Sequence, residues 1–352
     1  MPPPTAAAGY AGGFAAVHRA IARRMPVLTL TIASAVLRGN AMGDPSERQV
    51  PVYLPPDYET CTTRYPVVYF LAGLAGGGRL LLSESLWGET LPQRLERLVR
   101  AGAVRPLILV MADCLTRLGG SQYINSAATG RYEDHLVGEL VPRIDAALRT
   151  LPVREQRVVM GKSSGGYAAT VLAMRHPEVF GLAVDHSGDK YFEHCYRADI
   201  PAAVAALDRY EHDPGRFLAT FPQPPHARGR QWFALVNMLA MAACYSPNPD
   251  SAVGFDLPFD PSTGELRPAV WARWLAHDPV DLATAHADAL RRLHLYFLDC
   301  GRFDEHHLQL GNRIYTRRLQ ALGVPHVYEE FDGGHMNVAH RYDVSLQRVS
   351  EA

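Results

Sequence analysis

The hydrophobic and polar positions of this chain predict strands that alternate with helices. Segments 27–37 and 48–54 alternate apolar and polar residues, which is typical of an antiparallel strand pair at a sheet edge. Continuous apolar runs predict strands covered on both faces at 65–71, 106–112, 157–160, 179–185, 293–299 and 326–331. Helical spacing follows at 90–101, 133–148 and 308–322. The pattern predicts an α/β fold with a mostly parallel, eight-stranded sheet and helices on both faces.

This alternation of strands and helices stops between residues 190 and 291. Helical stretches there are broken repeatedly by proline, and the insertion offers no strand to the sheet. We interpret it as a helical cap over the crevice, with 232–244 as its most apolar helix; a purely structural buttress is the alternative. The core then comprises 26–189 and 292–352, preceded by a loose N-terminal extension at 1–25.

The strongest local motif is Gly161-Lys162-Ser163-Ser164-Gly165, between an apolar strand and an Ala-rich helix. It fits the Gly-x-Ser-x-Gly nucleophile elbow, in which a serine sits on a sharp strand-to-helix turn. Glycines on either side leave room for that strained backbone, and the following helix N-terminus favours developing negative charge. An ordinary Gly-rich helix N-cap is the alternative interpretation.

Two further residues complete a candidate catalytic set with Ser163. A serine hydroxyl needs an adjacent base, which a third group must orient. Asp304 and His335 each follow an apolar strand, in the order serine, acid, histidine that triad hydrolases of the α/β class show. From the sequence, His340 is an alternative to His335 as the catalytic histidine. Four other residues are alternatives to Asp304 as the acid: Glu305, Asp299, Asp185 and Asp189.

The Gly-rich loop 72–78 follows another buried strand. We expect a backbone N–H there, at Leu74 or a neighbour, to hold an oxyanion together with the N–H of Ser164; a plain flexible loop is the alternative. Its glycine spacing does not match the dinucleotide fingerprint. The polar segment 118–126 follows the next strand and is expected to line the same pocket. We therefore assign substrate binding to Gly73, Trp87, Tyr123 and Asn125.

Composition narrows the functional classes. The 352 residues carry a formal net charge of −1 without a basic block, which argues against nucleic acid or an anionic membrane surface as partner. Five single cysteines have no zinc-like spacing, and His306 and His307 fit the surface or a pocket rim better than a metal site. The longest apolar run, 232–245, is too short to span a bilayer, and the N-terminus has the wrong order of charge and apolar residues for a secretory signal. We expect a cytoplasmic enzyme without membrane insertion, metal or organic cofactor; a homo-oligomer stays open.

Between Leu37 and Met336, outside the cap, the chain resembles the Putative esterase branch of the α/β-hydrolases. That branch includes enterochelin esterases, S-formylglutathione hydrolases, feruloyl esterases and mycolyltransferases. The resemblance rests on residues 36–40, 52–55, 68–73, 161–166, 301–304 and 334–335. It implies an α/β-hydrolase fold, Ser163 as nucleophile, His335 as base, Asp304 as orienting acid, and backbone donors at Leu74 and Ser164. S-formylglutathione hydrolases typically have Ser-Met-Gly-Gly at the elbow, whereas this chain has Ser163-Ser164-Gly165-Gly166.

Together these features predict a serine esterase that hydrolyses a carboxylic ester of a small molecule through an acyl-enzyme. Two other classes remain: an acyltransferase that uses the same triad, and a non-catalytic binding protein on the same fold.

Overall fold

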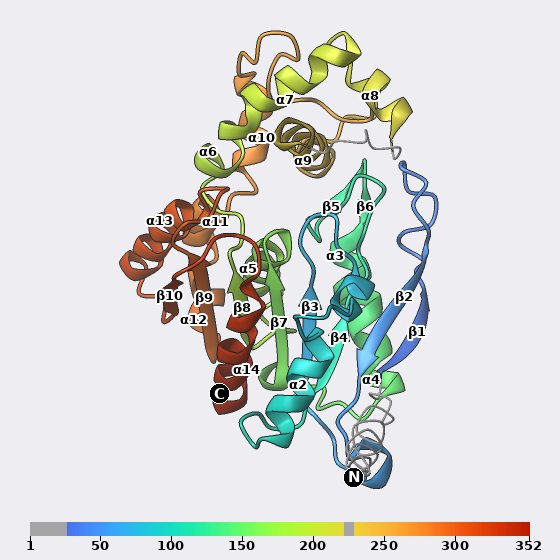
Figure 1. The fold of residues 1–352 in the computed structure, drawn as a ribbon, viewed down its shortest axis with the longest axis vertical. Helices are drawn as coiled ribbons and strands as arrows, with labels where there is room; N and C mark the ends of the chain where they lie inside the picture. Colours follow the sequence, from blue (N-terminus) through green and yellow to red (C-terminus); the bar gives the residue numbers. More distant parts are fainter. Residues whose placement is uncertain (1–26, 222–228) are drawn as a thin grey trace, which may run out of the picture.

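A computed structural model describes residues 27–221 and 229–352, so the predicted N-terminal extension lies outside the described residues. Within this part of the chain the main sheet has eight strands, in the order β1-β2-β4-β3-β7-β8-β9-β10 (Figure 1). The strands are β1 (Val27–Ala33), β2 (Glu47–Tyr53), β3 (Val67–Leu71), β4 (Ile108–Met111), β7 (Arg157–Lys162), β8 (Leu182–His186), β9 (Leu295–Gly301) and β10 (Val327–Phe331).

The sheet is parallel except for β2. This strand pairs antiparallel with β1 at the edge and with β4 on its other side, and every other pairing is parallel. The predicted mostly parallel sheet and α/β-hydrolase fold are therefore confirmed. The carboxyl ends of the parallel strands share one end of the sheet, where a ligand site is expected in such folds.

Both faces of the central strands are covered. In β3, Val67, Tyr69 and Leu71 belong to one hydrophobic cluster, while Val68 and Phe70 belong to the other. This split follows from the two-residue period of a strand and explains the uninterrupted apolar run. One face packs against α2 (Leu91–Arg100) and α14 (Arg341–Glu351), and the other against α4 (Val141–Ala147), α5 (Ser164–Arg175) and α13 (Leu308–Ala321).

The long insertion forms a group of helices at one end of the sheet (Figure 1). It contains α6 (Phe192–Cys195), η5 (Arg197–Asp199), α7 (Ile200–Leu207), η6 (Asp208–Tyr210), α8 (Pro214–Thr220), α9 (Arg230–Tyr245) and α10 (Pro268–Leu275). The most apolar helix of the insertion, α9, is buried from Ala234 to Tyr245.

The insertion's last two helices differ from the expectation. We assigned residues up to 291 to the cap, but α11 (Pro279–Ala285) and α12 (Ala287–Arg291) pack against α5 in the core. The ring Nδ1 of His286, between them, lies 3.1 Å from the carbonyl oxygen of Met174 in α5. These helices form the crossover layer that leads into β9, so they belong with the core helices and not with the group of helices at the end of the sheet.

Two other elements were not expected. The predicted helix 133–148 is split into α3 (Tyr132–Asp134), a π-helical turn η3 (His135–Leu140) and α4. The predicted pocket segment forms the short strands β5 (Asn125–Ser126) and β6 (Gly130–Arg131). Short 3-10 turns complete the described elements: η1 (Tyr58–Thr60), η2 (Gly78–Leu82), η4 (Arg154–Gln156) and η7 (Val338–His340).

All five cysteines are free thiols, and four of them are buried. No helix in the described ranges is long and apolar enough to cross a membrane.

Candidate active site

Ser163 stands at the sharp turn between β7 and α5. Its backbone has φ 60° and ψ −124°, a conformation that non-glycine residues rarely adopt. Two glycines make the turn possible, because a Cβ on Gly161 would lie 2.2 Å from the carbonyl oxygen of Gly165, and one on Gly165 would lie 1.9 Å from that of Leu71. The local sequence thus folds into the strained strand-to-helix turn that is expected of a nucleophile elbow.

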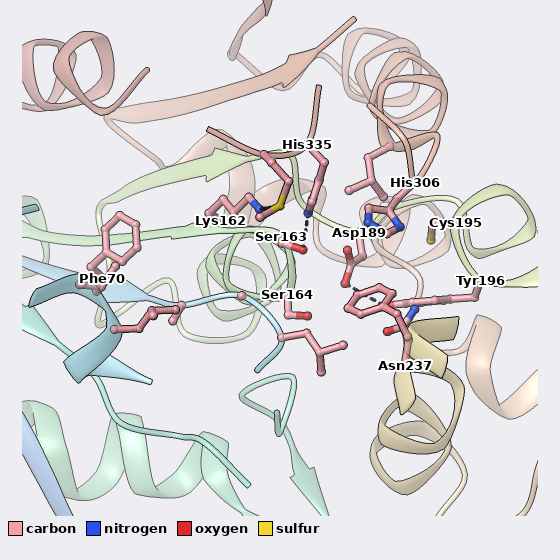
Figure 2. Close-up of a pocket in the computed structure, with 18 of the residues that line it drawn as sticks. Phe70, Lys162, Ser163, Ser164, Asp189, Cys195, Tyr196, Asn237, His306 and His335 are labelled. Atoms are coloured by element: carbon pink, nitrogen blue, oxygen red, sulfur yellow. Dashed lines mark hydrogen bonds between the residues drawn. The ribbon is translucent and has the colours of Figure 1, made fainter. Parts of the chain in front are cut away.

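His335 reaches Ser163 from the loop after β10. Its Nε2 lies 3.0 Å from Ser163 Oγ (Figure 2). Its Nδ1 lies 2.8 Å from Asp304 Oδ2. Asp304 follows β9 and accepts a second hydrogen bond, 2.9 Å long, on Oδ1 from the backbone N–H of His306. The structure therefore brings together the serine, histidine and carboxylate that the sequence analysis selected, in the hydrogen-bonded order that base-activated nucleophiles require.

The surroundings of this set favour a charged Asp304. Burial tends to raise the pKa of its carboxyl group, but the hydrogen bond and charge of His335 and the N–H of His306 outweigh burial and hold the pKa below its usual value. The neighbouring His306 behaves in the opposite way, because burial and the nearby His335 lower its pKa. Its ring packs edge-on against that of His335, with centroids 4.8 Å apart.

The alternative residues have other partners. Glu305 accepts the backbone N–H of His335 at 2.6 Å, so it holds the histidine loop without touching the ring. His340 is exposed, with its ring near the carbonyl oxygen of Asn337. Three more carboxylates have partners other than His335: Asp299 is bound by His186 and Arg341, Asp185 by Lys190, and Asp189 by Tyr196 and Gln122.

The loop after β3 brings backbone N–H groups next to Ser163. Gly73 packs so closely that a Cβ there would lie 3.1 Å from Ser163 Cβ, and Gly73 and Leu74 line the same cavity as Ser163. The Leu74 N–H has no acceptor among the described residues. Ser164 is the first residue of α5, so its N–H has no intrahelical acceptor either. These two donors are free to hold an oxyanion beside the serine.

A cavity of about 510 Å³ surrounds Ser163. Figure 2 shows Lys162 and Phe70 on one side of the serine and, on the other, a group that we call the cap-side lobe. The cap-side lobe consists of Asp189, Cys195, Tyr196, Phe233, Asn237 and His306, of which four come from the insertion. Sequence reasoning did not place these residues in the pocket, apart from listing His306 at its rim, because no motif marks them.

Three predicted substrate-binding residues lie elsewhere. Trp87 is 93% exposed and does not line the cavity. Tyr123 is buried behind loop 72–78 after β3, which we call the oxyanion loop for its expected role, and its hydroxyl donates to the carbonyl oxygen of Ala72 at 2.8 Å. Asn125 in β5 instead accepts the N–H of Asp134. For Tyr123 and Asn125 the reason is that segment 118–131 packs against the insertion: Ser126 Oγ donates to the carbonyl oxygen of Ala243 in α9 at 2.6 Å. Only Gly73 of the four lines the cavity.

The described ranges contain no cluster of three or more His, Cys, Asp or Glu side chains that could hold a metal ion.

Comparison with known proteins places this chain in a family. The sequence profile of the "Putative esterase" family matches residues 40–347. Among curated proteins, an endo-1,4-beta-xylanase/feruloyl esterase of Xylanibacter ruminicola is 30% identical over 153 residues, covering 40% of this chain and 19% of that protein. An esterase of Mycobacterium tuberculosis is 32% identical over 140 residues, covering 40% of this chain and 28% of that protein. The chain thus spans less than a third of the length of these curated relatives.

Solved structures share the fold. A ferulic acid esterase matches with a TM-score of 0.60 and 21% identity, over 92% of this chain and 97% of that one. An S-formylglutathione hydrolase from Agrobacterium tumefaciens matches with a TM-score of 0.57 and 15% identity, over 92% and 94% of the two chains. The chain therefore has the α/β-hydrolase fold of these structures, and with the profile match over most of its length it belongs to the "Putative esterase" family.

Proposed function

We propose that this protein is a serine esterase that hydrolyses a carboxylic ester through an acyl-enzyme. The observation that carries the proposal is the continuous hydrogen-bonded series from Ser163 Oγ through the His335 ring to Asp304, at 3.0 and 2.8 Å. Membership of an esterase family supports the same reaction.

In the first half of the reaction, Ser163 Oγ attacks the ester carbonyl carbon while His335 Nε2 takes the hydroxyl proton. The negative charge that forms on the carbonyl oxygen is held by the N–H groups of Leu74 and Ser164. Each donor of this kind typically lowers the barrier by about 3 kcal/mol. The His335 imidazolium is stabilised by Asp304 and returns its proton to the leaving alcohol oxygen. The acyl group stays on Ser163.

In the second half, a water molecule attacks the acyl-enzyme in the same geometry. His335 takes a proton from the water, the oxyanion forms again between the same two donors, and the carboxylic acid leaves as Ser163 recovers its proton. Each step uses side chains and backbone groups of this chain.

A series of p-nitrophenyl esters, from acetate to long acyl chains, tests the proposal. We expect turnover with an optimum chain length, and a fall of several orders of magnitude in Ser163→Ala. Ser262→Ala, which changes an exposed serine on the cap, is the matched control and should leave the rate unchanged. Equal turnover by the parent protein and Ser163→Ala would contradict the assignment.

Acyl transfer to an alcohol is the second candidate. Two observations support it: residues of the insertion line the cavity, and His335 is only 5% exposed. An active site that restricts the access of water favours transfer of the acyl group to an alcohol over hydrolysis. Product analysis with a competing alcohol separates the two reactions. A new ester as the main product would indicate a transferase, and free acid would indicate a hydrolase.

A further inference from the structure

Asp189 presents a carboxylate oxygen to the cap-side lobe. The residue follows β8 and is only 7% exposed. Its Oδ2 accepts hydrogen bonds from the hydroxyl of Tyr196 at 2.8 Å and the side-chain amide of Gln122 at 3.2 Å. Its Oδ1 has no hydrogen-bond donor among the described residues and remains accessible from the cavity. Figure 2 shows Asp189 between Tyr196 and the Ser163–His335 pair.

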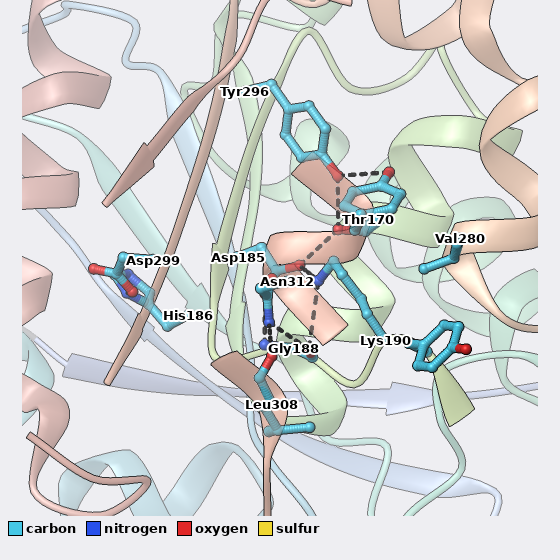
Figure 3. Close-up of polar contacts among 12 residues, drawn as sticks. Thr170, Asp185, His186, Gly188, Lys190, Val280, Tyr296, Asp299, Leu308 and Asn312 are labelled. Atoms are coloured by element: carbon cyan, nitrogen blue, oxygen red, sulfur yellow. Dashed lines mark hydrogen bonds and ion pairs between the residues drawn. The ribbon is translucent and has the colours of Figure 1, made fainter. Parts of the chain in front are cut away.

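The loop that carries Asp189 is fixed by a buried polar network (Figure 3). Asp185 pairs with Lys190, both side chains being fully buried, and it also accepts the backbone N–H of Gly188 at 2.8 Å. Asn312 donates to the carbonyl oxygen of Gly188 at 3.2 Å. Lys190 is therefore paired with Asp185, whereas Asp189 has no ion-pair partner in the described part of the chain. A buried carboxylate held this firmly is preorganised for a ligand.

The lobe offers other polar groups close to Asp189. No donor or acceptor among the described residues contacts either ring nitrogen of His306, and burial lowers the pKa of this ring, which favours its neutral form. Asn237 donates to Asp199 at 3.3 Å and keeps its carbonyl oxygen available. Burial raises the pKa of the Asp189 carboxyl group against the lowering effect of Tyr196 and Gln122, and a further hydrogen-bond donor to the carboxylate would lower this pKa again. The cap-side lobe therefore combines two hydrogen-bond acceptors, on Asp189 and Asn237, with the His306 ring, which can donate or accept.

We propose that Asp189, held by Tyr196 and Gln122, binds a hydroxyl group of the ester substrate. This inference rests on the proposed function, since it names a substrate feature recognised in the same cavity. A hydroxyl group donates to Asp189 Oδ1 and can at the same time accept from His306. The hydroxyl can belong to either the acyl or the alcohol part of the ester.

A hydroxyl fits this cavity better than a cation does. Lys162 lines the same cavity, and its nearest polar contact is Met336 Sδ at 4.0 Å, with no carboxylate at ion-pair distance in the described ranges. This ammonium group opposes the entry of a second positive charge. A neutral hydroxyl group is not repelled by Lys162, and it still donates the hydrogen bond that Asp189 Oδ1 lacks.

The test measures binding in Ser163→Ala, which cannot form the acyl-enzyme. Ligand-observed NMR gives dissociation constants for matched pairs of esters. For the alcohol part, the probes are monoacetates of straight-chain diols with two to six carbons and the O-methyl ethers of the same compounds. For the acyl part, they are methyl esters of 3-hydroxypropanoate, 6-hydroxyhexanoate and 7-hydroxyheptanoate and their O-methyl ethers. Acetylcholine serves as a probe with a charge but no donor.

We expect one chain length, in one of the two series, at which the hydroxyl compound binds about tenfold or more tightly than its methyl ether. Adding Asp189→Asn should abolish or reverse this preference. In that variant the asparagine carbonyl must accept from Tyr196 and Gln122, which turns its NH₂ donor toward the cavity. Adding Tyr196→Phe instead should reduce the preference without reversing it, because the carboxylate remains.

Asp44→Asn is the matched control. Asp44 is a buried aspartate away from this cavity that accepts the backbone N–H of Arg117, so its change should leave the preference intact. The proposal is overturned if no hydroxyl compound is preferred, if the preference survives Asp189→Asn, if that variant weakens both members of every pair equally, or if acetylcholine binds more tightly than every hydroxyl compound.

The outcome is separable from that of the proposed function. Binding is measured without the Ser163 hydroxyl, whereas hydrolysis is measured in the intact protein. A hydroxyl preference without any hydrolysis contradicts the esterase assignment alone. Hydrolysis without a hydroxyl preference contradicts the Asp189 assignment alone.

Discussion

Replacing Asp304 by asparagine keeps the shape of the side chain and changes what it offers to His335. The backbone N–H of His306 is a fixed donor 2.9 Å from Oδ1, so the asparagine must direct its carbonyl oxygen there. Its NH₂ group then faces His335 Nδ1, where Asp304 Oδ2 now accepts a hydrogen bond of 2.8 Å. This arrangement favours the imidazole tautomer that carries its proton on Nε2, so His335 presents an N–H to Ser163 and cannot act as its base.

The expected loss in kcat is about 10³- to 10⁴-fold, or roughly 4 to 5.5 kcal/mol of transition-state stabilisation. Asp304 is only 2% exposed, so bulk water does not substitute for the missing acceptor. The fold should survive, because Asp304→Asn keeps the side-chain volume and the hydrogen bond to His306.

Steady-state hydrolysis of a p-nitrophenyl ester, with thermal unfolding measured in parallel, checks this prediction. Asp332→Asn is the matched control, since it changes an exposed carboxylate in the loop that carries His335. The reasoning is refuted if Asp304→Asn stays within tenfold of the parent kcat while folded, or if the control loses as much activity.

Three further predictions concern the elbow, the oxyanion loop and pH. Gly165→Ala places a Cβ 1.9 Å from the carbonyl oxygen of Leu71 and should lower the free energy of unfolding by about 3 kcal/mol or more, measured by denaturant titration. Tyr123→Phe removes the 2.8 Å hydrogen bond to Ala72 behind the oxyanion loop and should lower kcat about tenfold with KM little changed. Burial raises the pKa of Asp278 to about 6 from 3.8, so the folded chain binds this proton more tightly than the unfolded chain does. Stability from this group is therefore present below pH 4 and is lost by pH 7, a fall of about 3 kcal/mol relative to Asp278→Asn in pH-dependent unfolding.

Matched changes check each of these effects. Gly138→Ala adds a Cβ with no atom within 4 Å and should change stability by less than about 1 kcal/mol. Tyr53→Phe removes a buried hydroxyl that has no hydrogen-bond partner and should not lower kcat. The arguments fail if Gly165→Ala is as stable as Gly138→Ala, if Tyr123→Phe keeps full kcat, or if the stability difference between the parent and Asp278→Asn does not change between pH 4 and 7.

Much of the fold could be predicted because the burial of a strand determines which of its positions must be apolar. Strands covered on both faces, such as β3, must be apolar throughout, and the edge strand β1 alternates. The crossover helices α11 and α12 were assigned to the cap because nothing in their sequence distinguishes packing against α5 from packing over the crevice. The strands β5 and β6 depend on support from α9, more than a hundred residues away, and local patterns do not report such contacts.

Ser163, Asp304 and His335 were predictable because each follows a strand whose carboxyl end lies at the same end of the sheet. The placement of Tyr123 was not. Gln122 and Tyr123 both have positive φ, 50° and 56°, without a glycine to signal it. This backbone directs Tyr123 behind the oxyanion loop and Gln122 toward Asp189.

The cytoplasmic location and the oligomeric state stay open predictions from the sequence. Fractionation of cells that produce the protein tests the location. Sedimentation tests whether the chain assembles with copies of itself.

The central claim is that Ser163 is the nucleophile, and covalent labelling tests it most directly. The protein is treated with a fluorophosphonate, digested, and mapped by mass spectrometry, with heat-unfolded protein as the control. The account predicts one adduct, on Ser163, that is absent from Ser163→Ala and from the unfolded protein. An adduct on another residue, or undiminished labelling and ester hydrolysis in Ser163→Ala, would contradict it.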